Sequence, residues 1–247
     1  MLKKLLPLLL LLPLAGCAGG QWGWYVVDPT TPAGYNNLWF LLTGLHYTVL
    51  LSVTAILISV AVGLLVALPG LSDNRYLRGF NRVYVEFVRA VPILVLILWV
   101  YYGLPDLDIR IALFWSGALA LAIGESAFLA EVFRGGIQSV PRGQIEAAKA
   151  ISLNYADTMR YVILPQAIRR ILPALGNQFI YVVKMSALVS IIGAPELTRK
   201  ANELIVTEYR ALEIYTVLAL EYLVLVLILS AGVRWLERKM GADERNP

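Results

Sequence analysis

The chain has 247 residues, of which 59% are hydrophobic and only 15% are charged. Soluble domains carry about 25% charged residues, so this composition excludes an ordinary soluble domain and predicts an integral membrane protein. The formal net charge of +4 is explained by Lys and Arg gathered on the cytoplasmic side of a membrane. Binding to nucleic acid is not indicated, because the sequence has no basic stretch interleaved with aromatic residues.

The first 17 residues have the pattern of a signal peptide. Two lysines precede an apolar stretch, Leu5–Leu14, that is too short to span a bilayer. It leads into Leu14-Ala15-Gly16-Cys17, which resembles the lipobox of bacterial lipoprotein precursors, where the cysteine is acylated. We therefore predict a signal peptide over residues 1–17, with Cys17 as the lipidation candidate, and an external linker over 18–37. An uncleaved apolar leader with a chance cysteine is the alternative.

Five hydrophobic segments follow, each long enough to cross a bilayer. The predicted spans are about 38–68, 83–104, 111–133, 171–193 and 212–236. Lys and Arg concentrate in the first and third loops between these spans and towards the cytoplasmic tail, 241–247. Because positive charge marks the cytoplasmic side, we predict an all-α, multi-pass membrane protein with five transmembrane helices, the N-terminus outside and the C-terminus inside.

The third loop, residues 137–170, is too polar to span the membrane but has ordered patterns. Gln144–Ser152 predicts a short amphipathic helix, with Ile145, Ala148 and Ile151 on one face. Asn154 is a good N-cap for a second short helix that ends before Pro165. Two short ordered helices on a cytoplasmic face suit docking to a partner. On the external side, the charged segment 195–208 predicts a solvated amphipathic helix.

The loop also contains Glu146-Ala147-Ala148, then Ser152, then Val162-Ile163-Leu164-Pro165. This spacing resembles the cytoplasmic EAA motif of the permease (transmembrane) subunits of type I ABC importers. The flanking stretches Phe87–Pro92, Ala130–Ile137 and Pro165–Ala167 resemble those of the polar amino acid family, which carries histidine, glutamine, arginine and opines. The departure is Ser152, which stands where the family has a glycine that permits a bend between the two helices.

The resemblance implies an ABC transmembrane type-1 permease domain over 38–240, in the bacterial cytoplasmic (inner) membrane. It implies that the coupling loop docks on a separate ABC ATPase subunit through Glu146, Ala147, Ala148, Ser152, Leu164 and Pro165. The other implied partners are a second permease, either a copy or a homologous chain, and an external amino-acid-binding protein. ATP and Mg belong to the ATPase, and no cofactor or metal is expected on this chain. The sequence has no Gly-Lys pair and hence no phosphate loop of its own.

Charged side chains within the spans are candidates for the substrate path, because a charge in lipid must face the interior of a bundle or pair. The charged candidates are Glu125, Glu131 and Lys184, which could hold the carboxylate and amino group of an amino acid, and the polar Ser186 near Lys184 is added to them. Salt bridges between helices are the alternative. Glu86 and Arg89 are weaker candidates, since they could snorkel to the cytoplasmic surface. We interpret Glu221 as a helix-packing contact and His46 as an interfacial or packed side chain.

These patterns predict a permease that moves polar amino acids by alternating access and performs no covalent chemistry. A permease of the same class for another small polar solute remains open. A membrane enzyme would need paired catalytic groups, yet Glu125 and Glu131 lie six residues apart, roughly 240° around a helix. A lipoprotein anchor or assembly factor would not need a cytoplasmic loop with this spacing.

Overall fold

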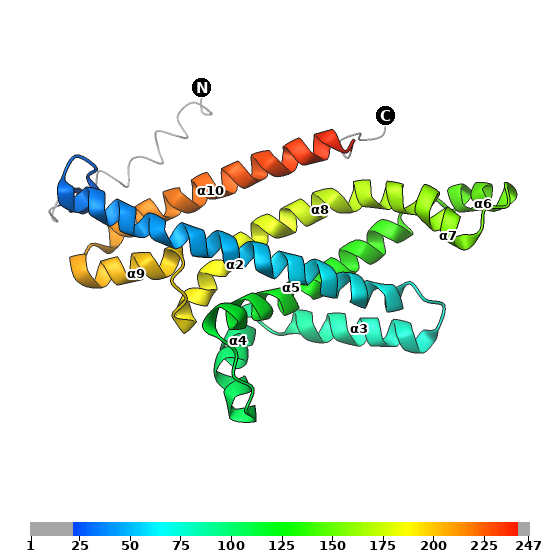
Figure 1. Cartoon of the computed structure of the whole chain (residues 1–247), viewed down its shortest axis with the longest axis horizontal. Coiled ribbons are helices and arrows are strands. Elements are labelled where there is room, and N and C mark those ends of the chain that lie inside the picture. Colours follow the sequence, from blue (N-terminus) through cyan, green and yellow to red (C-terminus); the bar gives the residue numbers. More distant parts are fainter. Residues whose placement is uncertain (1–21, 242–247) are drawn as a thin grey trace, which may run out of the picture.

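The computed structural model describes residues 22–241, and every regular element in that range is helical (Figure 1). The predicted signal peptide and Cys17 lie outside the described residues. The elements are η2 (Trp24–Val27), α2 (Pro32–Gly70), α3 (Arg75–Ala90), α4 (Ile93–Leu98), the π-helical η3 (Trp99–Gly103), η4 (Leu104–Leu107), α5 (Leu113–Gln138), α6 (Arg142–Ala150), α7 (Tyr155–Asp157), the π-helical η5 (Thr158–Ile163), α8 (Leu164–Met185), η6 (Ser186–Ile192), α9 (Leu197–Glu208) and α10 (Ala211–Lys239).

Four helical stretches are long and apolar enough to cross a membrane, or five if a bent pair counts as one span. The four are residues 32–70, 113–138, 155–192 and 211–239. They correspond to the first, third, fourth and fifth predicted spans. The fourth begins at residue 155, well before the predicted 171, and the other ends differ by at most six residues. The first begins early, because the Thr31 hydroxyl caps α2 by accepting a bond from the Gly34 N–H at 3.1 Å. The predicted linker 18–37 therefore contains η2 and the first turn of α2.

The predicted second span, 83–104, is not one straight helix. It starts earlier, at Arg75, and is broken between α3 and α4, whose directions differ by 93°. The break falls at Val91 and Pro92, where Val91 is extended with ψ at 123°. A residue before proline is pushed out of the helical region, and proline has no N–H to donate. The Val91-Pro92 pair therefore turns the chain sharply.

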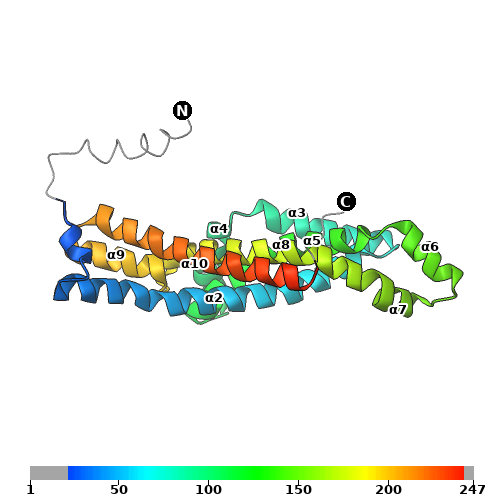
Figure 2. The ribbon, with the colours of Figure 1, turned by 90° about the horizontal axis from the view of Figure 1, so that it is seen from above.

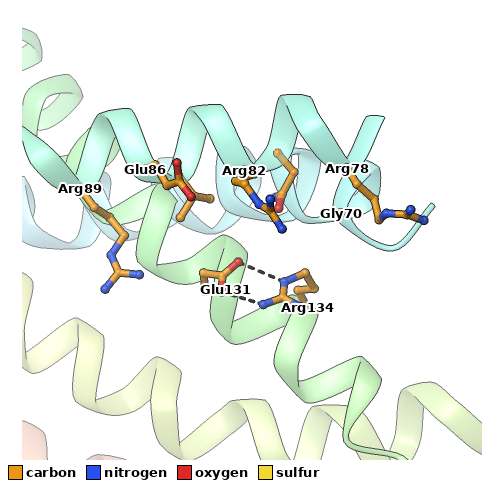
Figure 3. A pocket seen from close by; sticks show the side chains of 9 residues that line it. Gly70, Arg78, Arg82, Glu86, Arg89, Glu131 and Arg134 are labelled. Atoms are coloured by element: carbon orange, nitrogen blue, oxygen red, sulfur yellow. Dashed lines mark hydrogen bonds and ion pairs between the residues drawn. The ribbon is translucent and has the colours of Figure 1, made fainter. Parts of the chain in front are cut away.

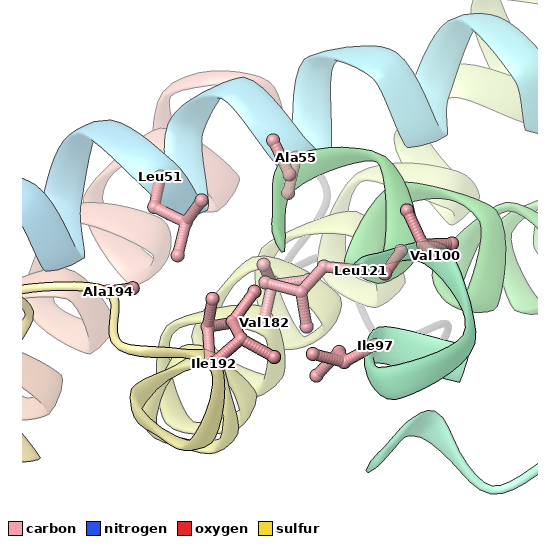
Figure 4. Close-up of a cluster of buried hydrophobic side chains, with 11 residues drawn as sticks. Leu51, Ala55, Ile97, Val100, Leu121, Val182, Ile192 and Ala194 are labelled. Atoms are coloured by element: carbon pink, nitrogen blue, oxygen red, sulfur yellow. The ribbon is translucent and has the colours of Figure 1, made fainter. Parts of the chain in front are cut away.

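Helix α2 packs along α5 and forms the main core with α4, α8 and η6. Figure 4 shows Leu51 and Ala55 of α2 facing Leu121 of α5, with Ile97 and Val182 completing the cluster. The helices approach closely at Gly63, where an added Cβ would lie 2.8 Å from the Leu129 Cβ. The Ser59 hydroxyl lies 3.1 Å from the Ala122 carbonyl oxygen. Small residues and hydroxyls at a helix contact are typical of membrane bundles.

The elongated molecule has two chemically different ends (Figures 1 and 2). One end holds η2, the start of α2, α9 and the start of α10. The other holds α6, α7 and the turn between α2 and α3, and α10 runs towards it without reaching its tip. The basic residues of the first and third predicted loops and of the C-terminal region therefore lie towards the same end, which we call the coupling end.

Candidate functional site

Helix α6 at the coupling end finishes in a tight cap built around Ser152. The Leu153 N–H donates to the Ala148 carbonyl at 3.1 Å, and the Ser152 N–H donates to the Lys149 carbonyl at 2.9 Å. This pair of bonds is the Schellman motif, whose penultimate residue takes left-handed backbone angles. Ser152 does so, with φ at 60°. The serine therefore makes the turn for which the family pattern has a glycine.

The second short helix starts as predicted but does not end before Pro165. The Asn154 side chain caps it by accepting a bond from the Asp157 N–H at 2.9 Å. Helix α7 then continues through the π-helical turn η5 directly into α8, which contains Pro165 in its first turn. The wider π turn just before the proline fits its missing N–H. The second coupling element is thus continuous with the fourth span.

The predicted EAA residues lie at the tip of the coupling end, with unequal exposure. Glu146 and Ala147 are exposed, whereas Ala148 is 3% exposed and packs inward. Of the three residues predicted on the apolar face of this helix, Ile151 lies just after its end and is 72% exposed. Tyr155, the first residue of α7, is 79% exposed as well. The loop therefore offers a rigid, capped helix with an exposed acidic residue and exposed apolar side chains.

Within the span region, Glu125 lines a small cavity at the break between α3 and α4. The cavity has a volume of about 200 Å³, and its polar lining is Arg89, Glu125 and Tyr181. Glu125 is only 2% exposed and accepts a hydrogen bond from the Gln178 side-chain amide. The Arg89 guanidinium stacks over Phe128, 4.7 Å from the ring centroid. Arg89 and Glu125 thus line one partly open space, which we call the break cavity.

A second cavity lies next to the first, towards the coupling end. Its volume is about 300 Å³, and its lining consists of Gly70, Arg78, Asn81, Arg82, Val85, Glu86, Arg89, Glu131 and Arg134. Glu131 is held by Arg134 through two bonds, Nε to Oε1 at 3.0 Å and Nη2 to Oε2 at 2.7 Å (Figure 3). We call this the lower cavity; Arg89 lines both.

The four predicted path residues are therefore not brought together. Glu125 and Glu131 line different cavities. Lys184 is exposed on α8, and the Ser186 hydroxyl donates to the Val183 carbonyl of its own chain segment at 2.8 Å. Sequence reasoning ranked Arg89 low and missed Gln178, Phe128 and Tyr181. The sequence feature that could have raised the rank of Arg89 is its position two residues before the Val91-Pro92 pair.

At the opposite end, a buried carboxylate fixes the start of α9. Glu196 accepts bonds from the Arg199 N–H at 2.6 Å, the Thr198 N–H at 2.9 Å and the Tyr222 hydroxyl at 3.0 Å. Burial raises the pKa of the Glu196 carboxyl, and these donors, which favour the charged form, offset only part of that effect. The predicted amphipathic helix is present as α9, and one of its faces is buried.

The chain is similar to known membrane transport proteins over most of its length. Residues 59–242 match the family described as "Binding-protein-dependent transport system inner membrane component". The glutamine transport system permease protein GlnP of Escherichia coli (strain K12) is 36% identical over 222 residues, 89% of this chain and 98% of that protein. The "Probable glutamine ABC transporter permease protein GlnM" of Bacillus subtilis (strain 168) is 37% identical over 206 residues, 83% of this chain and 95% of that protein.

Solved structures agree with these relatives. A chain of an amino acid ABC transporter crystallised with histidines shares 42% identity and superposes with a TM-score of 0.77, covering 83% of this chain and 95% of that one. A chain of the methionine ABC transporter MetNI in an inward-facing conformation has the same fold, with a TM-score of 0.69 and 23% identity over 82% of this chain and 96% of that one. This chain belongs to the family of binding-protein-dependent transport system inner membrane components.

Proposed function

We propose that this chain is the membrane-spanning permease subunit of an ATP-driven importer of polar amino acids, with glutamine the first candidate substrate. The relatives named for glutamine transport support the substrate class. The observation that carries the proposal is the break cavity, where Arg89 and Glu125 face one space. A permease of the same class for another small polar solute is the remaining candidate.

The break cavity suits the two charges common to all amino acids. The Arg89 guanidinium can pair with a carboxylate through two parallel hydrogen bonds, and its position over Phe128 restricts how far it can turn. Glu125 can accept bonds from an ammonium group, while Gln178 orients its carboxylate. Because Glu125 is buried, an ion pair with its carboxylate is less screened than one in water. We expect the substrate to lie across the α3–α4 break.

The coupling end suits docking on the ATPase chain that hydrolyses ATP with Mg. When the ATPase closes on ATP, its movement must reach the spans through the loop. A loop that bent would absorb part of that movement. The capped turn at Ser152 and the continuity of α7, η5 and α8 supply that stiffness. We propose that Glu146, Ala147, Ser152 and the exposed Ile151 and Tyr155 contact the ATPase, with Ala148, Leu164 and Pro165 keeping the loop in shape.

We propose that the coupling end faces the cytoplasm and that η2 and α9 face outwards, towards an amino-acid-binding protein. The clustering of Lys and Arg at the coupling end supports this orientation. It also fits a signal sequence over 1–17 that is cleaved just before Cys17, which would then be the first mature residue and carry the lipid. The membrane is then the bacterial inner membrane, and a second permease completes the path.

Reconstitution tests the substrate assignment. The permease is placed in proteoliposomes with its ATPase and binding protein, and glutamine uptake is measured for Arg89→Gln and Glu125→Gln. We expect each variant to lose about tenfold or more of uptake while ATP hydrolysis without substrate continues, because a charge-assisted bond in a buried site is removed. Glu237→Gln, which removes a partly exposed carboxylate of α10 outside both cavities, is the matched control.

Two results would decide against parts of this proposal. Normal glutamine uptake by both break-cavity variants would show that the substrate takes another path. Uptake of a different polar solute, with none of any amino acid, would favour the second candidate. Lys184→Gln in the same assay tests whether the exposed Lys184 contributes, for example through the second permease. Mass spectrometry of the mature chain tests the lipid at Cys17, and an intact Met1 peptide would exclude it.

A further inference from the structure

The lower cavity has a charge pattern that the proposed import function does not yet use. Arg82, Glu86 and Arg89 are spaced four and three residues apart on α3, so they project from one face of the helix. Figure 3 shows them following one another along α3 above the Glu131–Arg134 pair of α5. Positive, negative and positive groups therefore alternate along one wall of a concave space of about 300 Å³.

The residues of this wall differ in whether their charges are already matched. Glu131 and Arg134 satisfy each other through two hydrogen bonds. Arg78 donates from Nη1 to the carbonyl oxygens of Ser72 and Asp73. Within the part of the chain that the structure describes, Arg82 and Glu86 make no hydrogen bond or ion pair with another residue. These two side chains are thus available to a ligand, in a cavity with a fixed opposite wall.

The back of the cavity is built and does not depend on the exposed charges. Asn81 is buried and donates from Nδ2 to the Val66 carbonyl at 2.8 Å. An added Cβ at Gly70 would lie 2.9 Å from the Asn81 side chain. Asn81 therefore locks α3 against the end of α2, and the absence of a Cβ at Gly70 leaves room for that contact. A plain solvated basic face would not require such a junction.

We propose that the lower cavity is a second binding site for amino acid zwitterions, in which Arg82 takes the carboxylate and Glu86 takes the ammonium group. This site lies on the cytoplasmic side of the break cavity, and the inference rests on the proposed import function. Arg89 lines both cavities, so a substrate carboxylate that leaves Arg89 can move to Arg82 while it stays close to a guanidinium. The lower cavity then holds the substrate before release.

If the lower cavity binds the substrate before release, amino acid that is already inside the vesicle should bind there too and slow import. The complete importer is reconstituted with L-glutamine inside at rising concentrations, and the concentration that halves the import rate is measured. We expect Arg82→Gln and Glu86→Gln each to raise that concentration by about fivefold or more, because each removes one charge-assisted bond to the zwitterion. Arg75→Gln, on α3 but outside the cavity lining, should leave it unchanged.

The chemistry of the ligand is tested with 4-aminobutanamide, which lacks the carboxylate of glutamine. Inside the vesicles this compound should inhibit import by the wild type more weakly than glutamine does. Arg82→Gln should not reduce the inhibition by this compound any further. Glu86→Gln should reduce the inhibition by this compound, since 4-aminobutanamide keeps the ammonium group that Glu86 binds. Equal effects of Arg82→Gln on both compounds would contradict the assignment of the carboxylate to Arg82.

The remaining outcomes separate this inference from the function on which it rests. If the wild type imports glutamine but both lower-cavity variants keep the wild-type inhibition, the second site is wrong and the import function stands. If the wild type imports no amino acid, both are wrong. If the effect of Arg82→Gln disappears in vesicles without anionic phospholipid, Arg82 binds a lipid headgroup, and the zwitterion site is overturned.

Discussion

Single residues at this protein's sites are constrained by backbone geometry as much as by side-chain chemistry. Ser152 shows this best. Its left-handed backbone, with φ at 60°, places the Cβ close to the following carbonyl, which costs roughly 1–2 kcal/mol for a residue other than glycine. The turn persists because two capping hydrogen bonds close it. The coupling loop therefore keeps the family's turn while using a residue that is not suited to it.

Replacing Ser152 with glycine should relieve this strain. Part of the gain is offset because glycine loses more conformational freedom on folding, so we expect a net stabilisation of about 0.5–1 kcal/mol. Thermal unfolding of the purified permease in detergent measures it. Ser139→Gly is the matched control, because Ser139 ends α5 with an ordinary φ of −75°. Destabilisation by Ser152→Gly would show that the serine side chain itself supports the loop.

Helices in this protein are positioned by their ends and breaks as well as by their apolar faces. The start of α9 is an example, since Glu196 joins it to Tyr222 of α10. The neighbouring Leu197 N–H donates to the Thr48 hydroxyl of α2 at 3.2 Å. Gly44 permits this approach, as an added Cβ would lie 2.7 Å from the Glu196 carbonyl carbon. Three helices therefore meet at one capping residue.

Glu196→Ala should destabilise the permease by about 2 kcal/mol, because an N-cap is lost and the partly buried Tyr222 hydroxyl loses its bond to the carboxylate. Glu203→Ala is the control on the same helix. Its ion pairs with Arg199 at 2.9 Å and Lys200 at 3.4 Å involve partly exposed side chains, which contribute at most about 1 kcal/mol. Thermal unfolding in detergent compares the two variants. Equal losses would mean that Glu196 acts only as another surface charge.

At the scale of the whole molecule, function depends on which end faces the cytoplasm. The coupling end carries the EAA motif and the predicted cytoplasmic loops, and α10 runs towards it, while η2 and α9 lie at the other end (Figure 1). This separation gives a direct topological test, because a reagent that cannot cross the membrane reaches only one end in intact cells.

Two cysteine variants, made in a chain whose Cys17 is replaced by serine, carry out this test. Thr30 is exposed before α2, and Gly143 in α6 has no atom within 4 Å of an added Cβ. We expect a membrane-impermeant maleimide to label Thr30→Cys in intact spheroplasts, and to label Gly143→Cys only after permeabilisation. Labelling of Gly143→Cys from outside would reverse the proposed orientation. Retained glutamine uptake in both variants serves as the control for correct assembly.

Composition and local patterns determined the class of this protein and its chain-local features. Long apolar runs require membrane helices, because backbone groups in lipid must bond within the segment. Capping by Asn154 and the short helix Arg142–Ala150 followed from neighbouring residues, and the motif spacing predicted the permease family. These features depend on residues close in sequence, so a single chain segment is enough to reveal them.

Only the tertiary structure decided which charges share a space. Glu125 meets Gln178 from another helix, and Arg89 reaches both cavities because the chain bends by 93° at the α3–α4 break. The predicted span 83–104 runs through Pro92 without a break, and neither the angle nor the facing helix can be read from local sequence. The exposure of Lys184 could not be read from local sequence either. Side-chain pairing across a bundle depends on helix rotation and tilt, which long-range packing determines.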